Sequence, residues 1–277
     1  MYRYSEALCQ ERIINYLKKI RSTKSISHAY IIQDEFSENA KTIAYAFAMS
    51  LHCQKGGVEA CYDCHACKQI LKNNHPDLIY VEAQNQKSIS VGDIREKVND
   101  TVEIKPYSSL YKVYIIDKAD SMTVQAQNAL LKTMEEPPEY VKFLLATTDP
   151  QKLPITILSR CMQFHLKALD EPQISAHLNR VLTAENIPFD APALDKLAKA
   201  AQGSIRDSLS LTDQAIAMGN GKVSTDVVNT MLGLLDEDQP IEIIYALHQG
   251  NGERLMKTIQ TVAEKAGDWD ELLAETA

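Results

Sequence analysis

Glycine is almost missing from the first 202 residues of this 277-residue chain. Of its ten glycines, only Gly56, Gly57 and Gly92 lie in that part, and none precedes Gly56. A phosphate-binding loop needs glycine between a strand and the next helix, because side chains there keep the backbone N–H groups away from the phosphate. The sequence therefore excludes a glycine-rich phosphate cradle in the first strand–turn–helix unit.

Long apolar runs and a surplus of positive charge are missing as well. No run of about 18 apolar residues occurs, and the N-terminus lacks the apolar core of a signal peptide. We therefore expect a cytoplasmic protein without a membrane partner. The net charge of −8 argues against tight binding of nucleic acid by this chain alone, because such binding needs many cations to neutralise phosphates.

Charge and tyrosine are distributed unevenly. Residues 1–145 hold 18 basic and 18 acidic residues, whereas residues 146–277 hold 11 and 19. Eleven of the twelve tyrosines lie at or before Tyr140. The two halves are either different domains or segments with different histories.

Apolar runs alternate with amphipathic stretches up to residue 167. The near-continuous runs predict strands, and the stretches with apolar residues three and four apart predict helices. This order indicates an α/β fold with a parallel sheet covered on both faces. The expected strands are 28–32, 75–82, 112–117, 142–148 and 162–165, and the expected helices are 6–21, 38–51, 90–102 and 121–134.

Helical periodicity alone follows residue 167, with short connections that predict a small bundle. The expected helices are 171–185, 191–201, 204–217 and 225–234, followed by a longer helical stretch from Pro240 through Leu273. We expect three domains, which are an α/β domain over 1–167, a helical domain over 168–235 and the start of a third, helical domain over 236–277.

Four cysteines are gathered in the pattern C-x7-C-x2-C-x2-C, at Cys53, Cys61, Cys64 and Cys67. Two overlapping C-x2-C steps place three thiolates on one knuckle, and Cys53 can close a tetrahedral site with no open position, as is typical of structural zinc. A disulfide framework does not suit a cytoplasmic protein. His65 is an alternative fourth ligand.

Two predicted strands lead to candidate residues of a nucleotide site. Asp117 ends a strand whose carboxyl end faces the ligand crevice of a parallel sheet, where a carboxylate can hold the water shell of Mg²⁺. A helix cap is the alternative interpretation of this aspartate. Lys41 and Thr42 stand where an ATP-binding loop places its lysine and hydroxyl.

The surroundings of these residues contradict an intact site. Asp34, Glu35 and Glu38 would lie beside the phosphates, and each partly buried carboxylate would repel a polyanion by roughly 1 kcal/mol or more. Lys118 follows the strand-terminal aspartate, at the position where a glutamate would polarise the attacking water. We interpret the segment as a degenerate nucleotide site.

Two arginines each have a functional and a plain interpretation. Arg160, in the sequence Ser-Arg-Cys after the fourth strand, can reach a phosphate bound by a neighbouring subunit or form a surface salt bridge. Arg206 lies in the first turn of a helix that Ser204 can cap, and it either points toward the preceding domain or is a surface charge.

Taken together, these segments resemble subunits of the bacterial DNA polymerase III clamp loader, within the AAA+ class. The resemblance covers nearly the whole chain and implies an AAA+ parallel sheet flanked by helices, an inserted zinc knuckle over 53–67, a helical lid domain and the start of a truncated collar domain. The segments that carry it are HAYII, the knuckle, HPDLIYVE, VYIIDKAD, QAQNALLKTMEEPP, LLATTDPQKLPITILSRC and GSIRDSLSLTDQAIA.

The resemblance also implies a role for each candidate residue. Arg160 would act in trans on ATP held by the adjacent subunit, and Asp117 would stand at the Walker B position. Any ATP and Mg²⁺ site of this chain would be weak or lost. In that site, Lys41 and Thr42 would be the Walker A lysine and hydroxyl. Thr147 or Thr148 would stand at sensor 1, and Arg206 at sensor 2.

Two clamp-loader subunits share the resemblance. Residues 1–143 are similar to delta-prime, the member that has lost its own ATPase activity, and residues 144–277 are similar to the gamma/tau motor subunit. The change in charge and tyrosine content falls near the same place, which favours a fusion with a junction near 140–150. One divergent lineage is the competing explanation.

The function implied is that of a non-motor, delta-prime-like subunit of the DNA polymerase III holoenzyme that supports ATP-driven loading of the sliding clamp onto primed DNA. Its expected partners are the motor and delta subunits of a hetero-pentamer, the sliding clamp and, through the assembly, primer-template DNA. The alternative is a gamma/tau-type ATPase that binds and hydrolyses ATP in cis.

Overall fold

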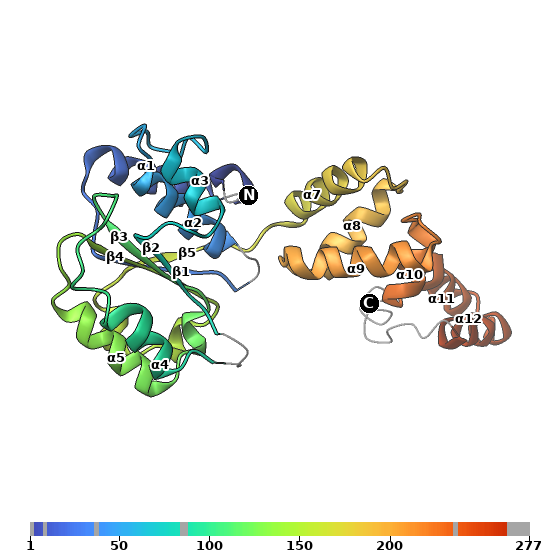
Figure 1. The fold of residues 1–277 in the computed structure, drawn as a ribbon. Coiled ribbons are helices and arrows are strands. Elements are labelled where there is room, and N and C mark those ends of the chain that lie inside the picture. The colour runs from blue at the N-terminus through green and yellow to red at the C-terminus, as the bar shows by residue number, and fades with distance from the viewer. Residues whose placement is uncertain (1–2, 8–9, 36–38, 84–87, 235–237, 265–277) are drawn as a thin grey trace. The chain divides into compact units, whose positions relative to one another are not determined.

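The chain divides into two compact units, Met1–Ala168 and Leu169–Ala277 (Figure 1). The computed structural model describes residues 3–7, 10–35, 39–83, 88–234 and 238–264. In these ranges every strand belongs to the first unit, and none of the helices combines the length and apolar character that a bilayer crossing needs.

A five-stranded sheet forms the centre of the first unit (Figure 1). The strand order is β2-β3-β4-β1-β5, and all neighbouring pairs are parallel. The expected α/β fold with a parallel sheet is therefore confirmed. The strands are β1 (Ala29–Gln33), β2 (Leu78–Val81), β3 (Lys112–Ile116), β4 (Val141–Thr147) and β5 (Met162–His165).

Alternate side chains of the strands enter two cores, one on each face of the sheet. In β1, Tyr30 and Ile32 join the core with α1 and α2, whereas Ala29 and Ile31 join the core with α4 and α5. Figure 1 shows these helices in two layers around the sheet. The helices of this unit are α1 (Glu11–Thr23), α2 (Asn39–His52), α3 (His65–Leu71), α4 (Val91–Ile94), α5 (Val124–Glu135) and α6 (Ile155–Leu158).

Several helix boundaries differ from the expected ones. The helix expected over 90–102 is α4 followed by a π-helical turn, Arg95–Asn99. Helix α5 begins at Val124 because the hydroxyl of Thr123 accepts a hydrogen bond from the N–H of Ala126 (3.2 Å). Helices α3 and α6 were not expected, since seven and four residues are too few to show helical periodicity.

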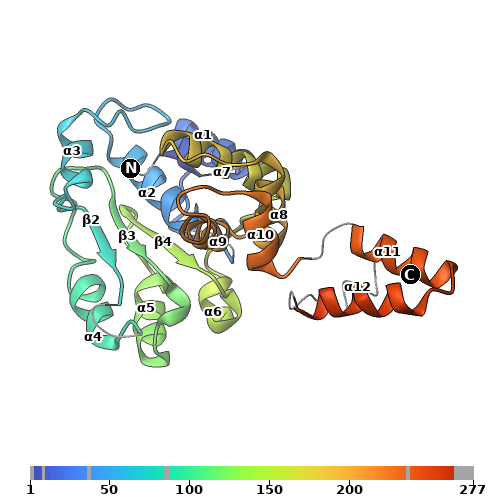
Figure 2. The same ribbon diagram turned by 90° about the vertical axis from the view of Figure 1, so that its right-hand side faces the viewer.

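The described part of the second unit is helical, with Leu178, Leu194 and Leu197 buried in its core. The single stretch expected over 240–273 is wrong: the chain turns after α11, where Gly250 has a φ of +63°, and residues 265–277 lie outside the described residues. The helices, seen in Figure 2, are α7 (Glu171–Ala184), α8 (Ala191–Ala200), α9 (Ile205–Met218), α10 (Thr225–Leu232), α11 (Asp238–His248) and α12 (Gly252–Glu264).

Candidate functional site

The four clustered cysteines meet between α2 and α3. Cys53 follows the last residue of α2, Cys64 is the N-cap of α3 and Cys67 lies within α3. Together with that of Cys61, their Sγ atoms all lie within 4.8 Å of one another. Zinc–sulfur bonds of about 2.3 Å in a tetrahedron place the sulfurs about 3.8 Å apart, so small rotations bring all four onto one ion. His65 is exposed and does not belong to this group, which favours the four cysteines.

The backbone around these cysteines stabilises negative charge. The N–H of Cys61 donates to Sγ of Cys53 (3.4 Å), and the N–H of Cys64 donates to Sγ of Cys61 (3.3 Å). The N–H groups of Asp63 and Cys64 lower the pKa of Cys61 to about 6. Burial, by contrast, raises the pKa of Cys67. A divalent cation at this point would let the buried thiols ionise together, so the residues present fit a metal ion.

A carboxylate of the chain itself caps the start of α2. Asp34 follows β1, and its Oδ2 accepts a hydrogen bond from the N–H of Ala40 in the first turn of α2 (3.1 Å). Asp34 is only 4% exposed. In a phosphate-binding loop, the N–H groups at this helix end hold the phosphate instead. The carboxylate thus occupies a donor that a phosphate would need and places negative charge beside it.

Lys41 and Asp117 are paired with each other. Lys41 Nζ lies 3.2 Å from Asp117 Oδ2. The hydroxyl of Tyr80, on β2, donates to the same oxygen (2.5 Å), and Lys41 Nζ lies 5.1 Å from the centre of the Tyr80 ring. The lysine and the carboxylate therefore neutralise each other, and Asp117 receives two protein contacts where the water shell of Mg²⁺ would approach.

A second carboxylate organises the residues around Asp117. Asp120 Oδ1 accepts hydrogen bonds from the hydroxyl of Thr147 (2.8 Å) and from the N–H of Thr148 (3.1 Å), and its Oδ2 accepts from the hydroxyl of Thr148 (3.2 Å). Both threonines expected near sensor 1 thus contact Asp120. Lys118 is exposed and adopts the left-handed region with a φ of +50°.

Arg160 lies at the surface of the first unit, after α6. Its Nη1 donates to the carbonyl of Thr156 (2.8 Å), and its Nη2 lies 3.4 Å from Glu135 Oε1. These contacts orient the guanidinium group, while 34% of the side chain stays exposed. The surface salt bridge that was one of the two interpretations of Arg160 is therefore present. The exposed part of its guanidinium group can still contact an anion on another chain.

The two remaining expected site residues, Arg206 and Thr42, belong to different units of the chain. Arg206 is exposed in the first turn of α9, in the second unit, where the hydroxyl of Ser204 accepts from the N–H of Asp207 (3.1 Å) as a cap. Thr42 is half-buried in the first turn of α2.

Two residues of the site, Tyr80 and Asp120, were not singled out from the sequence. No motif marks Tyr80, because its contact with Asp117 depends on the register of β2 against β3. For Asp120, the one available signal was a second acid three residues after Asp117.

Two family models match consecutive parts of the chain. Residues 9–170, more than half of it, match the model described as DNA polymerase III, delta subunit, and residues 173–221 match DNA polymerase III clamp loader subunit, ATPase lid domain. The fold resembles the RuvB Holliday junction branch migration motor of Thermotoga maritima, with a TM-score of 0.58 and 15% identity over 89% of this chain and 78% of that chain. This likeness shows the AAA+ type of fold alone.

Curated relatives align with nearly the whole chain. DNA polymerase III subunit tau/gamma of Haemophilus influenzae is 55% identical over 99% of this chain and 40% of the relative. DNA polymerase III subunit gamma of Buchnera aphidicola subsp. Acyrthosiphon pisum is 36% identical over 98% and 75%. The chain spans about 40% of the length of the Haemophilus influenzae relative and of DNA polymerase III subunit tau of Escherichia coli. The alignment of 275 residues runs through residues 140–150, which counts against the expected fusion. The chain belongs to the family of bacterial DNA polymerase III clamp-loader subunits.

Proposed function

We propose that the chain is a non-motor subunit of the clamp loader, which supports ATP-driven loading of the sliding clamp onto primed DNA without hydrolysing ATP itself. The observation that carries this proposal is the occupation of its nucleotide site by its own side chains. Asp34 caps α2 through the N–H of Ala40 (3.1 Å), and Lys41 is paired with Asp117 (3.2 Å).

A nucleotide would have to displace both contacts. Two like charges about 4 Å apart repel by about 1 kcal/mol in water and about 4 kcal/mol near a protein surface, so the carboxylate of Asp34 opposes each phosphate charge that approaches α2. Lys118 stands in place of the glutamate that would polarise the attacking water. Nucleotide binding is therefore weak, and turnover in cis is absent.

A gamma/tau-type ATPase that works in cis is the second candidate, and the relatives favour it. Proteins named tau, gamma or tau/gamma align with 98–99% of the chain. They support descent from the motor type better than descent from delta-prime. The contacts of Asp34 and Asp117 support loss of hydrolysis. A subunit of motor descent whose own site has been lost agrees with both observations.

Arg160 is the residue we assign to the active site of the adjacent subunit. Its guanidinium is oriented by Thr156 and Glu135 yet remains partly exposed. A fixed positive charge supplied by a neighbouring subunit stabilises the transferring phosphoryl group. In this account the chain contributes to catalysis only in trans.

Zinc is the metal we assign to the four cysteines. Four thiolate ligands suit zinc and leave no open coordination position, so the ion has a structural role. It would hold the end of α2 to α3 through Cys53, Cys64 and Cys67.

The partners follow from membership of the family. They are the motor and delta subunits of a hetero-pentamer, the sliding clamp and, through the assembly, primer-template DNA, all in the cytoplasm. Residues 168–235 would form the lid domain, which the matched lid model over 173–221 supports, and residues 236–277 would begin the collar domain.

Titration of the isolated chain with fluorescent ATP and Mg²⁺ tests the central step. We expect no turnover and binding no tighter than millimolar. Asp34→Asn should bind ATP more tightly than the unchanged chain, because the substitution removes the repelling charge. Tight Mg²⁺-dependent binding, with turnover that Lys41→Ala abolishes, would instead establish the ATPase in cis.

A further inference from the structure

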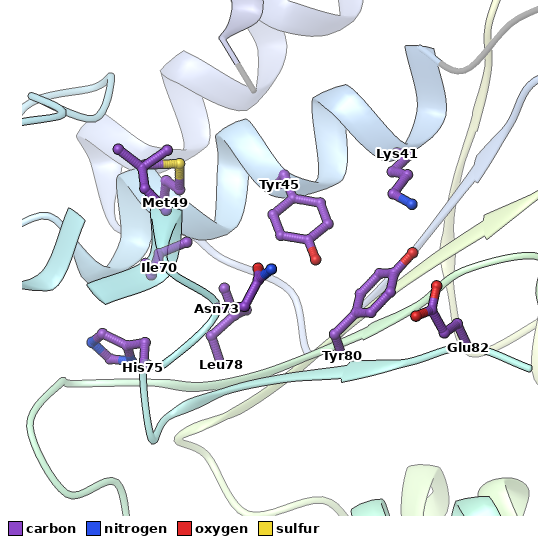
Figure 3. A pocket seen from close by; sticks show the side chains of 10 residues that line it. Lys41, Tyr45, Met49, Ile70, Asn73, His75, Leu78, Tyr80 and Glu82 are labelled. Carbon is purple, nitrogen blue, oxygen red and sulfur yellow. The ribbon is translucent and has the colours of Figure 1, made fainter. Parts of the chain in front are cut away.

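An elongated groove of about 630 Å³ lies between α2 and β2 in the first unit (Figure 3). Its volume lies within the range of about 300–1,000 Å³ that is typical of ligand sites. One row of side chains on α2 faces one row on the strand, and Ile70 and His75 lie at the end away from Lys41 and Glu82. Leu71 and Asn73 complete the lining. The facing rows are Lys41, Tyr45 and Met49 on α2 and Leu78, Tyr80 and Glu82 on and after β2.

The floor of this groove is the edge of the sheet. Strand β2 is the last strand in the order, and among the described residues no strand pairs with its outer side, as Figure 2 also shows. The carbonyl of Asp77, which precedes β2, accepts from the N–H of Val113 in β3 (2.8 Å). Because backbone groups alternate in direction along a strand, the N–H and C=O of Tyr80 and the C=O of Leu78 point outward.

The residues with outward backbone groups are also those whose side chains line the groove. Leu78 and Tyr80 face α2, whereas Ile79 and Val81 pack with the core on the opposite face. An extended peptide that pairs with a sheet edge presents alternate side chains on one face. Such a peptide would therefore form hydrogen bonds with the outward backbone groups of β2 and place its side chains in the groove at the same time.

The lining determines which peptide would fit. Its apolar part is made by Met49, Ile70 and Leu78, of which Met49 and Ile70 are buried. At one end the charge of Lys41 is offset by Asp117 (3.2 Å). The carboxylate of Glu82 is exposed and has no ion-pair partner among the described residues, so it is available to a cation at that end of the groove. Burial lowers the pKa of His75, which is therefore neutral near pH 7.

We propose that β2 and this groove bind an extended segment of a partner protein by strand addition. Alternate apolar side chains of the segment enter the groove, and a lysine or arginine of the segment lies beside Glu82. The groove shares Lys41 and Tyr80 with the candidate nucleotide site, but the contacts proposed for the segment are those of Leu78, Glu82 and the backbone of Tyr80, so the proposal does not depend on whether the chain hydrolyses ATP.

A peptide selection tests this proposal. Random heptapeptides displayed on phage are selected on the full chain, and the strongest binder is synthesised with a fluorescent label for anisotropy titration. We expect alternate apolar residues with a basic residue, and at least tenfold weaker binding to Glu82→Lys and to Leu71→Glu. Both altered side chains are exposed, so these variants should fold. Val124→Glu, exposed on α5 on the opposite face of the sheet, should bind as the unchanged chain does.

N-methylation of the selected peptide distinguishes two modes of binding, which are strand addition to β2 and insertion of side chains into the groove alone. Methyl groups on alternate peptide nitrogens in one register should abolish binding, because they remove the N–H groups that donate to the outward carbonyls of Leu78 and Tyr80. Methyl groups in the other register should change binding little. Equal binding to all variants, indifference to methylation in both registers, or failure to select any peptide would overturn the proposal.

Discussion

Asp34 and Ala40 are joined by one hydrogen bond of 3.1 Å, and in the proposed function this contact links the stability of α2 to the loss of a phosphate site. A carboxylate at this position satisfies an N–H group that otherwise lacks a partner within the helix. Its negative charge also interacts favourably with the positive, N-terminal end of the helix dipole. In the proposed function, the same interaction that stabilises the helix also opposes the binding of a phosphate there.

Substitution of Asp34 measures this link. Asp34→Ala should lower the free energy of unfolding by about 0.5–2 kcal/mol, as expected for loss of a capping side chain. Asp34→Asn should lower it less, since the amide oxygen can still accept from Ala40. Urea unfolding followed by circular dichroism gives both values. Two variants as stable as the unchanged chain would show that the cap contributes nothing.

The carboxylate of Asp77 should make the stability of the chain depend on pH. It accepts hydrogen bonds from the N–H groups of Tyr107 (2.6 Å) and Ser108 (2.7 Å). Burial alone would raise the pKa of Asp77, but these hydrogen bonds outweigh burial and lower it. The folded pKa is thus below the unfolded value of about 3.9. The stability that this carboxylate contributes is present above about pH 4 and is lost as the pH falls through the folded pKa.

Asp77→Asn should therefore destabilise the chain at neutral pH, by about 1–3 kcal/mol for loss of hydrogen bonds to a charged group. The difference from the unchanged chain should shrink as the pH is lowered below about 4. Urea unfolding at a series of pH values measures that difference. A gap that stays constant with pH would mean that Asp77 ionises equally in the folded and unfolded chain.

At the scale of elements, the strands were predictable because β1, β3 and β4 are continuous buried runs. Their order across the sheet came only from the structure. The meeting of Lys41 and Asp117 follows from a general rule, since carboxyl ends of parallel strands share one edge. Their mutual pairing, and the contact of Tyr80 with Asp117, depend on side-chain geometry that no spacing specifies. Helix α3 was not predicted because its seven residues are too few to show helical periodicity.

We predict that a zinc ion bound by the cysteine knuckle stabilises α3. The ligands would be Cys53, Cys61, Cys64 and Cys67. The purified chain should hold about one equivalent of zinc, and Cys64→Ser should lose most of it, because a three-thiolate site binds more weakly. Loss of the ion should also speed hydrogen exchange in α3. Metal analysis and exchange measured by mass spectrometry test both outcomes.

Cys161→Ser is the matched control for this variant. Burial raises the pKa of Cys161 to about 12, and this cysteine lies outside the cluster, so its substitution should leave the metal content unchanged. Well-folded chain with less than about half an equivalent of zinc would contradict the assignment.

At the scale of the whole molecule, two observations point in different directions. The relatives that align along the chain are tau and gamma subunits, whereas the contacts around α2 and Asp117 are those on which the proposed loss of nucleotide binding rests. The uneven charge and tyrosine content remains, although the alignments cross residues 140–150. Codon usage along the coding sequence is the test that would still separate a fusion from one divergent lineage.

The most direct measurement compares Arg160→Ala with Lys41→Ala in a clamp loader reconstituted from this chain with motor and delta subunits, after size-exclusion chromatography has shown that they assemble. Clamp- and DNA-stimulated ATPase activity is recorded for each. The account predicts that Arg160→Ala lowers the rate of the adjacent site by roughly 10³-fold or more, as for other arginines supplied in trans, while Lys41→Ala leaves the rate unchanged. Loss of activity with Lys41→Ala, together with an unchanged rate for Arg160→Ala, would contradict it.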